Sequence, residues 1–314
     1  MHAGESASSG GALVVPSSVS RQEIHTGSTL APNGYTAMAG QITGRATWKK
    51  GIATAAGATV VALSLLAATP GVSAAGRYAA PVTSSYGTDP LQTVTLYAAG
   101  ARLAILVHGG GFRSSAADAA HLAPEAKDLQ KSGITAAIVN YRDDASAPAF
   151  PNEVDDVVAG ARAAMALTGA TQVSVIGGSS GGTLASLAAE SLGPQASNVF
   201  PLSGTEDLPG ALAYWTSVGG KLGALHIGNI TTALGGADPA LYSPAALVSS
   251  ALTGQTWYVY NSAAELQPVS QADTMTAALT AQGIPVTETI VPGHGHAWAY
   301  WKTIRAQVIA AVLA

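Results

Sequence analysis

A glycine- and serine-rich junction between a strand and a helix constrains this chain more than any other segment. Residues 173–176 are mostly apolar, residues 177–182 contain only glycine and serine, and an apolar helical pattern follows at once. Two G-x-S-x-G frames fit, centred on Ser179 or on Ser180, and a sharp turn of this kind needs small residues around its serine. At a helix N-terminus, free N–H groups stabilise negative charge. The junction predicts a nucleophilic serine, and we prefer Ser179 because its frame leaves a pair of glycines for close helix packing.

Apolar runs typical of strands alternate with helical patterns along the rest of the chain. The predicted strands cover 94–97, 103–107, 134–140, 173–176, 199–202, 257–260 and 286–291, and the predicted helices cover 116–131, 152–167, 180–191, 271–282 and 297–313. Several runs are continuously apolar, as in strands that are buried on both faces. We therefore expect an α/β domain with a mostly parallel sheet and helices on both faces. Residues 205–250 interrupt the alternation after a strand, and we expect them to form a small lid insertion.

Three consecutive glycines follow the second predicted strand. The sequence His108-Gly-Gly-Gly111 comes directly after the apolar run 103–107. Glycines allow backbone N–H groups to approach a substrate oxygen closely, and such donors stabilise an oxyanion in the transition state. The loop is therefore a candidate oxyanion hole, in which His108 is expected to hold the loop by hydrogen bonds and not to take part in catalysis.

Two histidines lie in a glycine-rich turn between the last predicted strand and the final helix. They are His294 and His296, in the sequence Pro-Gly-His-Gly-His. A histidine that follows the serine and an acid along the chain matches one known order of a catalytic triad. The pair could instead bind a metal ion, but the only Asp, Glu or Cys close by is Glu288 on the preceding strand, so we expect no metal site.

Taken together, these motifs resemble those of α/β-hydrolase fold esterases and lipases related to hormone-sensitive lipase. The resemblance extends from about residue 90 to the C-terminus. It is carried by HGGGF at 108–112, NYR at 140–142, Phe150-Pro151, Asp156, GGSSGG at 177–182, YSP at 242–244 and PGHGH at 292–296.

This resemblance implies an α/β-hydrolase fold and a role for each motif. It assigns the nucleophile to Ser179 and the general base to His296. The oxyanion-hole donors would be the backbone N–H groups of Gly110, Gly111 and Ser180. Arg142 and Asp156 fall at family positions that are structural. Some family members have a large N-terminal cap over the pocket, but only about 20 residues separate 75 from 94 here, too few for such a cap. The pocket would then be covered by the insertion over 205–250 or left open.

The acid of the triad is the point at which this sequence departs from the family. Ala264 occupies the position at which the family has Asp, and Glu265 is its neighbour. A glutamate is one methylene longer, so Glu265 could reach His296 from one position further along. We expect Glu265 to be the acid; Asp273 is the alternative, and a site without an acid is the third possibility.

The N-terminal part of the chain has the features of a sorting segment. Residues 1–48 are predicted to be a disordered extension, because Ser, Gly, Thr and Pro are frequent in most of it. Residues 49–74 resemble a secretory signal peptide, with Lys49-Lys50, an apolar run over 52–68 and a small-residue site that ends at Ala74. The apolar run is shorter than a typical membrane span, so an uncleaved anchor is the second choice and a buried core helix the third.

The position of this signal suggests a different start of translation. Signal peptides begin at the N-terminus, so Met38 is the expected true start. Cleavage near Ala74-Ala75 would then leave a secreted catalytic domain over 75–314, with no stable membrane span after processing.

Composition excludes several classes of protein. The net charge of −4 argues against a nucleic-acid partner, and the absence of cysteine excludes a thiol nucleophile and disulfides. We expect a secreted serine carboxylic-ester hydrolase that forms an acyl-enzyme on small-molecule or lipid esters, with no cofactor. Two alternatives remain: an amidase or peptidase with the same triad, and a catalytically inactive hydrolase that serves as a binding module.

Overall fold

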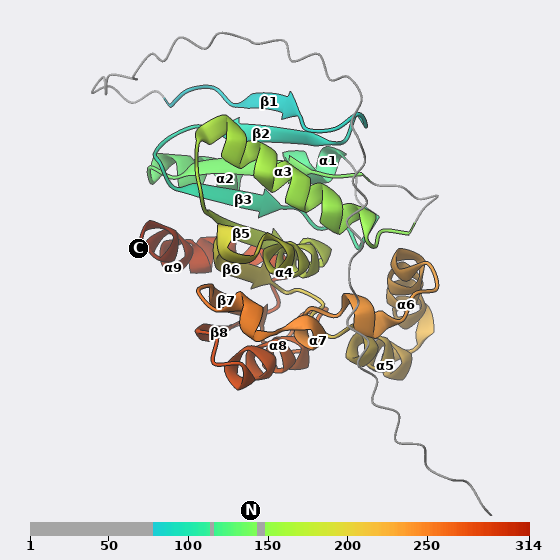
Figure 1. Cartoon of the computed structure of the whole chain (residues 1–314). Coiled ribbons are helices and arrows are strands. Elements are labelled where there is room, and N and C mark those ends of the chain that lie inside the picture. Colours follow the sequence, from blue (N-terminus) through green and yellow to red (C-terminus); the bar gives the residue numbers. More distant parts are fainter. Residues whose placement is uncertain (1–77, 114–115, 143–147) are drawn as a thin grey trace, which may run out of the picture. The chain divides into compact units, whose positions relative to one another are not determined.

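The computed structural model describes residues 78–113, 116–142 and 148–314 (Figure 1). The predicted extension and signal peptide, residues 1–74, lie outside the described residues, as does the proposed cleavage site. No helix in these three stretches is long and apolar enough to cross a bilayer.

An eight-stranded sheet runs through the described part of the chain in the order β1-β2-β4-β3-β5-β6-β7-β8. Its strands are β1 (Val82–Ser85), β2 (Thr93–Tyr97), β3 (Leu103–Val107), β4 (Thr135–Asn140), β5 (Val173–Gly178), β6 (Ala196–Leu202), β7 (Thr256–Ser262) and β8 (Val286–Val291). β2 pairs antiparallel with both β1 and β4, and every other pair is parallel. The prediction of a mostly parallel sheet is correct. β1 was not predicted, because its sequence VTSS is largely exposed and lacks an apolar run.

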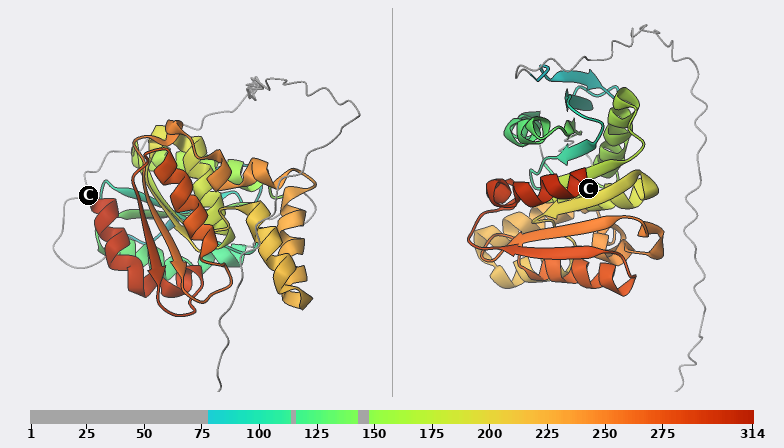
Figure 2. Two further views of the ribbon diagram at one scale, coloured as in Figure 1. Left: turned by 90° about the horizontal axis from the view of Figure 1, so that it is seen from below. Right: turned by 90° about the vertical axis from the view of Figure 1, so that its left-hand side faces the viewer.

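Helices cover both faces of the sheet. The main ones are α2 (Ala123–Lys131), α3 (Asn152–Thr168), α4 (Ser180–Leu192), α8 (Ser270–Ala281) and α9 (Trp301–Leu313). Buried residues of α3, α4 and α8 belong to one apolar cluster and those of α2 and α9 to another. The right-hand view in Figure 2 shows α2 and α9 on one side of the sheet and α3 and α4 on the other.

Two helices differ from their predicted extents. The predicted helix over 116–131 is divided into α1 (Ala116–Ala120) and α2, because Pro124 occupies the first turn of α2. Proline fits the first turn of a helix but lacks the N–H that a helix interior requires. The predicted final helix begins with a 3-10 turn over Ala297–Tyr300, and α9 starts only after it.

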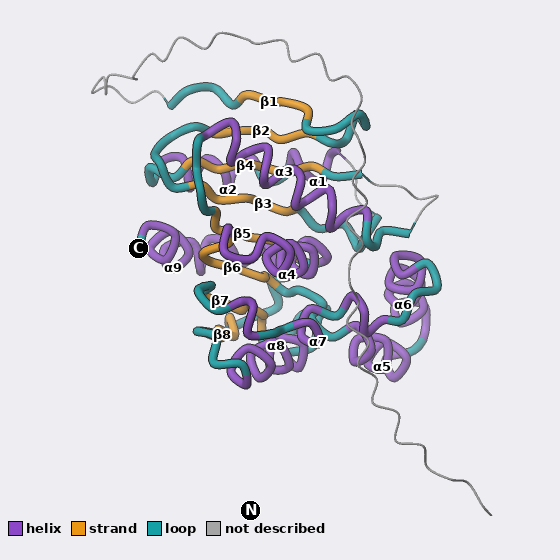
Figure 3. Tube along the Cα trace, in the orientation of Figure 1, coloured by secondary structure: helices purple, strands orange, loops and turns teal. Residues whose placement is uncertain are grey.

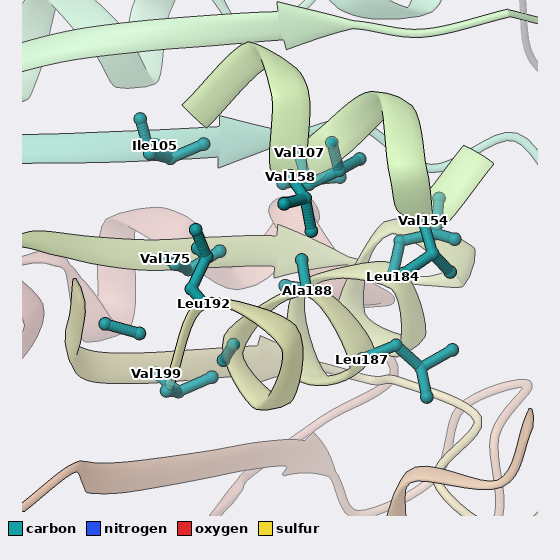
Figure 4. Packing of buried hydrophobic residues seen from close by; sticks show 14 of the residues in the cluster. Ile105, Val107, Val154, Val158, Val175, Leu184, Leu187, Ala188, Leu192 and Val199 are labelled. Carbon is teal, nitrogen blue, oxygen red and sulfur yellow. The ribbon is translucent and has the colours of Figure 1, made fainter. Parts of the chain in front are cut away.

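The apolar side chains of strand β3 pack on both faces of the sheet. Ile105 and Val107 lie in the cluster with α3 and α4, whereas Leu106 lies in the cluster with α2 and α9. Figure 4 shows Val107 beside Val158 of α3, and both side chains belong to the same cluster. Full burial of one such side chain contributes about 1.5–3 kcal/mol. The sheet is therefore a firm platform for groups at its carboxyl edge.

The predicted insertion after β6, which we call the lid, is helical. It contains α5 (Leu208–Val218), α6 (Gly220–Leu234) and the short α7 (Pro244–Leu247), as Figure 3 shows. α5 and α6 lie beyond the carboxyl ends of the central strands (Figure 1). They are therefore placed at the edge of the sheet where the serine turn after β5 and the glycine loop after β3 also lie.

Candidate active site

The junction between β5 and α4 forms a strained turn at Ser179. This residue has φ 58° and ψ −129°, a conformation that costs free energy for a residue with a side chain. Its N–H donates to the carbonyl oxygen of Leu202 at 2.8 Å, which ties the turn to β6. A Cβ atom on Gly181 would lie 2.2 Å from the carbonyl oxygen of His108. The glycine is required because the first turn of α4 packs directly against the loop after β3.

Three side chains from distant segments form a continuous chain of contacts at this edge of the sheet. The Nε2 atom of His296 lies 2.9 Å from Ser179 Oγ. Its Nδ1 atom contacts a carboxylate oxygen of Glu265. The neighbouring His294 instead contacts the carbonyl oxygen of Ala264 at 3.1 Å and is exposed. The geometry separates the two histidines and places only His296 beside the serine.

Buried hydrogen bonds hold the Glu265 carboxylate in place. Its side chain is fully buried, and Oε1 accepts from the Ser203 hydroxyl at 2.7 Å and from the Ser262 N–H at 2.6 Å. Asp273, the alternative acid, is exposed in the first turn of α8. The extra methylene of Glu265 thus bridges the one-residue offset, while Asp273 contacts no member of this network.

Ser203 and Tyr300 support this carboxylate, and sequence reasoning did not single out either residue. Ser203 has φ 54° and is completely buried. Its Oγ accepts from the Ala297 N–H at 3.0 Å and lies 2.8 Å from the Tyr300 hydroxyl. Burial raises the pKa of Tyr300, so its hydroxyl stays protonated. For Ser203, the signal in the sequence was its position as a polar residue directly after the apolar run of β6. The carboxyl ends of strands in a parallel sheet are where functional groups lie.

The glycine loop after β3 lies next to the serine. Gly110 has φ 138° and Gly111 has φ 67°, which favour glycine at both positions. The Gly111 N–H donates to Ser180 Oγ at 3.0 Å. From the sequence we expected Ser180 to contribute only its backbone N–H. That expectation was incomplete, because the buried hydroxyl turns back from the first turn of α4 and anchors the loop.

His108 has the structural role that was expected. Its Nε2 atom lies 3.0 Å from Asn140 Oδ1, and its ring stacks on Tyr141 with 4.1 Å between ring centroids. Burial lowers the pKa of His108, which keeps the ring neutral. The side chain is buried and belongs to the support of the glycine loop.

The glycine loop, the serine and the lid enclose a pocket of about 300 Å³. Ser179, Ser180, His296, Gly110 and Gly111 form one side of it. The other sides come from the lid and neighbouring loops: Phe112, Thr205, Trp215, His226, Asn229, Ile230, Leu266 and Gln267. Trp215 of the lid lines the pocket, whereas its neighbour Tyr214 and the C-terminal Trp298 and Trp301 are not among the lining residues.

Comparisons with known proteins agree with this arrangement. A family model described as BD-FAE matches residues 96–200, which include the glycine loop and the serine turn. A truncated carbohydrate esterase from gut microbiota superposes with a TM-score of 0.62 at 17% identity, covering 75% of this chain and 96% of that one. The chain has the α/β-hydrolase fold.

Further matches to this α/β-hydrolase fold come from esterases and lipases. A hormone-sensitive lipase from a metagenome library has a TM-score of 0.57 at 23% identity, covering 70% of this chain and 81% of that one. An esterase/lipase from an uncultured bacterium has a TM-score of 0.56 at 19% identity, with coverages of 70% and 78%. A search of curated protein sequences finds no match. These findings confirm, at the level of the fold, the resemblance inferred from the motifs.

Two further residues of the α/β-hydrolase motifs lie away from the pocket. Arg142 and Asp156 form a bidentate pair, with both N···O distances at 2.8 Å. Asp156 also accepts from Gln92 Nε2 at 2.8 Å. This network joins the segment before β2 to α3 and gives both residues a structural role.

No metal site accompanies the pocket in the described stretches. Among residues 78–113, 116–142 and 148–314, no three His, Asp or Glu side chains come close enough together to hold a metal ion. The Ser179 hydroxyl and the His296 imidazole line this pocket together with the glycine loop.

Proposed function

We propose that this chain is a serine carboxylic-ester hydrolase that acts through an acyl-enzyme. The observation that carries the proposal is the unbroken chain of contacts from Ser179 Oγ through His296 to the buried Glu265 carboxylate. A serine hydroxyl is a weak nucleophile by itself and is activated when an oriented base accepts its proton. The glycine loop in the same pocket supplies donors for the negative charge that develops on the substrate oxygen.

Each group has a defined part in the first half of the reaction. Ser179 Oγ attacks the acyl carbon while His296 Nε2 accepts the hydroxyl proton. Glu265 keeps the other ring nitrogen protonated and stabilises the imidazolium that forms. The oxyanion is stabilised by the N–H groups of Gly110 and Ser180, while the Gly111 N–H, which donates to Ser180 Oγ, holds the loop in position. Each such donor is typically worth about 3 kcal/mol in the transition state.

In the following steps His296 acts first as an acid and then again as a base. His296 gives its proton to the departing alcohol oxygen, so the ester C–O bond breaks and the acyl group remains on Ser179. Water then loses a proton to His296 and attacks the acyl carbon, the bond to Ser179 Oγ breaks, and His296 returns the proton to Oγ, which releases the acid and restores the serine hydroxyl. The hypothesis of an inactive binding module depended on Ala264 at the position of the acid, and the contact between Glu265 and His296 argues against it. An amide substrate would use the same groups, and no observation favours it.

A covalent probe tests this proposal directly. A fluorophosphonate should label the protein once per chain, and mass spectrometry of the digest should place the adduct on Ser179. The labelled protein should lose hydrolysis of p-nitrophenyl acetate in proportion to labelling. The matched control is Ser179→Ala, which should take up no label. A folded wild-type protein that neither labels nor hydrolyses the ester would contradict the proposal.

We also propose that the enzyme is exported. The support is in the sequence alone: Lys49-Lys50, the apolar run over 52–68 and the small residues that end at Ala74. N-terminal sequencing of protein recovered from the culture medium should begin at or near Ala75. Recovery of cell-bound protein that retains residues 52–68 would favour an anchor instead.

A further inference from the structure

The lid carries two polar side chains into the pocket that holds the serine. His226 and Asn229 on α6 line the same pocket as Ser179 and His296, next to Ile230. Both are only partly buried, so their polar atoms are open to a bound molecule. A lid that served only to cover an apolar acyl chain would need no such groups at these positions.

His226 is held in a fixed orientation above the pocket. Its ring stacks on Trp215 with 3.9 Å between centroids and an interplanar angle of 11°. Trp215 is itself buried, with 1% of its surface exposed, so it is a firm support. Burial, followed by the nearby His296, lowers the pKa of His226. The imidazole is therefore neutral at neutral pH, with one ring nitrogen that donates and one that accepts.

Asn229 lies against the glycine loop. A Cβ atom placed on Gly111 would be 2.9 Å from Asn229 Nδ2, so the amide is next to the backbone that receives the substrate oxygen. A group bound by Asn229 must therefore be close to the reacting carbonyl. Gln267 and Thr205, the other polar residues of these walls, already bond to each other at 2.8 Å. His226 and Asn229 are thus the lid groups offered to a substrate.

The charge and size of the pocket narrow the class of substrate. None of the described residues that line it is Lys, Arg, Asp or Glu. A charged group on the substrate would lose water there without gaining an opposite charge, which is costly. The volume of about 300 Å³ is at the lower end of the range for ligand pockets, about 300–1,000 Å³. The pocket suits a compact, uncharged molecule.

We propose that the site, acting as the ester hydrolase described above, is selective for compact, uncharged esters that carry a hydroxyl close to the ester group, and that His226 and Asn229 bind this hydroxyl. A hydroxyl both donates and accepts, which matches a neutral imidazole and an amide. A purely apolar ester would displace water from these groups and replace none of its hydrogen bonds, a loss that lowers its kcat/KM. Sites that hydrogen-bond a substrate hydroxyl reject analogues that lack it for this reason.

A matched pair of substrates tests the inference. The full-length protein is assayed by pH-stat with methyl 3-hydroxybutanoate and methyl butanoate, which differ by one hydroxyl, and with monomethyl succinate as a charged ester. We expect kcat/KM for the hydroxylated ester to exceed that for methyl butanoate by about tenfold or more, which corresponds to about 1.4 kcal/mol. The charged ester should be the poorest of the three.

Two variants locate the source of this preference. His226→Phe keeps a ring to stack on Trp215 but removes both nitrogens, and Asn229→Leu keeps the volume but removes the amide. Each should lower the hydroxyl preference several-fold. Lys221→Ala, at an exposed position of the same helix, is the control and should retain the preference. Circular dichroism melts of each variant show whether the fold is retained.

The possible outcomes separate this inference from the proposed function. Hydrolysis of both esters at similar kcat/KM, or a preference that survives both lid variants, would overturn the selectivity and leave the ester hydrolase standing. The absence of both fluorophosphonate labelling and hydrolysis of any ester would instead overturn the proposed function, and the selectivity with it.

Discussion

The triad and the lid line the same pocket but are held in very different ways. The Glu265 carboxylate is fully buried and accepts two hydrogen bonds from residues at the ends of β6 and β7. The lid helix α6 has a largely exposed outer surface, where Leu222 and Leu225 are 46% and 56% exposed. Its inner face packs on the core through Ile230 and Leu234, which are buried. The comparison places the triad acid among fully buried strand ends and the polar lid groups on a helix with one buried and one exposed face.

The largest expected effect comes from the nucleophile in the sheet region. Ser179→Ala should lower kcat for p-nitrophenyl acetate by about 10⁶-fold, because removal of a triad serine leaves only the oxyanion donors and substrate binding. The melting temperature should not fall, since the strained turn at this position loses no packed side chain. A comparable loss from Ser180→Ala instead would show that the serine of the other G-x-S-x-G frame is the reactive one.

The next effect concerns the acid, where the sequence left three possibilities open. Glu265→Gln should lower kcat by about 10⁴-fold with little change in KM, because a neutral amide neither fixes the tautomer of His296 nor stabilises its imidazolium. Asp273→Asn is the matched control at an exposed position and should behave like the wild type. The reverse ranking of these two variants would refute the assignment of Glu265.

A smaller effect is expected at the contact between the serine turn and the glycine loop. Ser180→Ala removes the hydroxyl that accepts from the Gly111 N–H at 3.0 Å. We expect kcat to fall by roughly fivefold, since one hydrogen bond contributes about 1 kcal/mol to the position of the loop. Steady-state kinetics with p-nitrophenyl acetate measure this, and Ser180→Thr, which retains a hydroxyl, should restore much of the activity. An unchanged kcat in Ser180→Ala would show that the loop needs no such anchor.

The last prediction concerns stability and not activity, at a buried carboxyl outside the triad. Glu206, just after β6, is fully buried, and burial raises its pKa from 4.5 to about 8. Between these two values the folded protein holds a proton that the unfolded chain has released. The free energy of unfolding should therefore fall as the pH rises through this interval, by up to about 1.4 kcal/mol per pH unit from this group.

The variant Glu206→Gln removes the titration of this group. The free energy of unfolding of the variant minus that of the wild type should be more positive at pH 8 than at pH 5. Urea denaturation at the two pH values measures this difference. Burial also raises the pKa of the nearby Glu190, which remains in the variant, so the slope should decrease and not vanish. An identical pH dependence in wild type and Glu206→Gln would mean that this carboxyl is ionised in the folded protein.

Sequence alone was sufficient for the parts of the site that depend on backbone shape. The turn at Ser179 and the loop at Gly110 and Gly111 require residues with little or no side chain, so their geometry is visible as a local pattern of glycines. Continuous apolar runs likewise identified a sheet buried on both faces. In contrast, β1 and the start of α9 escaped prediction, because an exposed strand has no apolar run and a 3-10 turn has no distinct pattern.

Only the tertiary structure decided which side chains meet. Glu265 and Asp273 are both carboxylates after β7, and the choice between them follows from where the loop after β7 passes His296. Ser203 supports Glu265 from 62 residues away, and His226 reaches the pocket because α6 folds back over the strand ends. Contacts of this kind depend on the order of strands in the sheet and on packing between layers. Local sequence patterns therefore determine the turns and strands of this protein, whereas the supports of its acid and the polar face of its lid arise only when distant segments pack together.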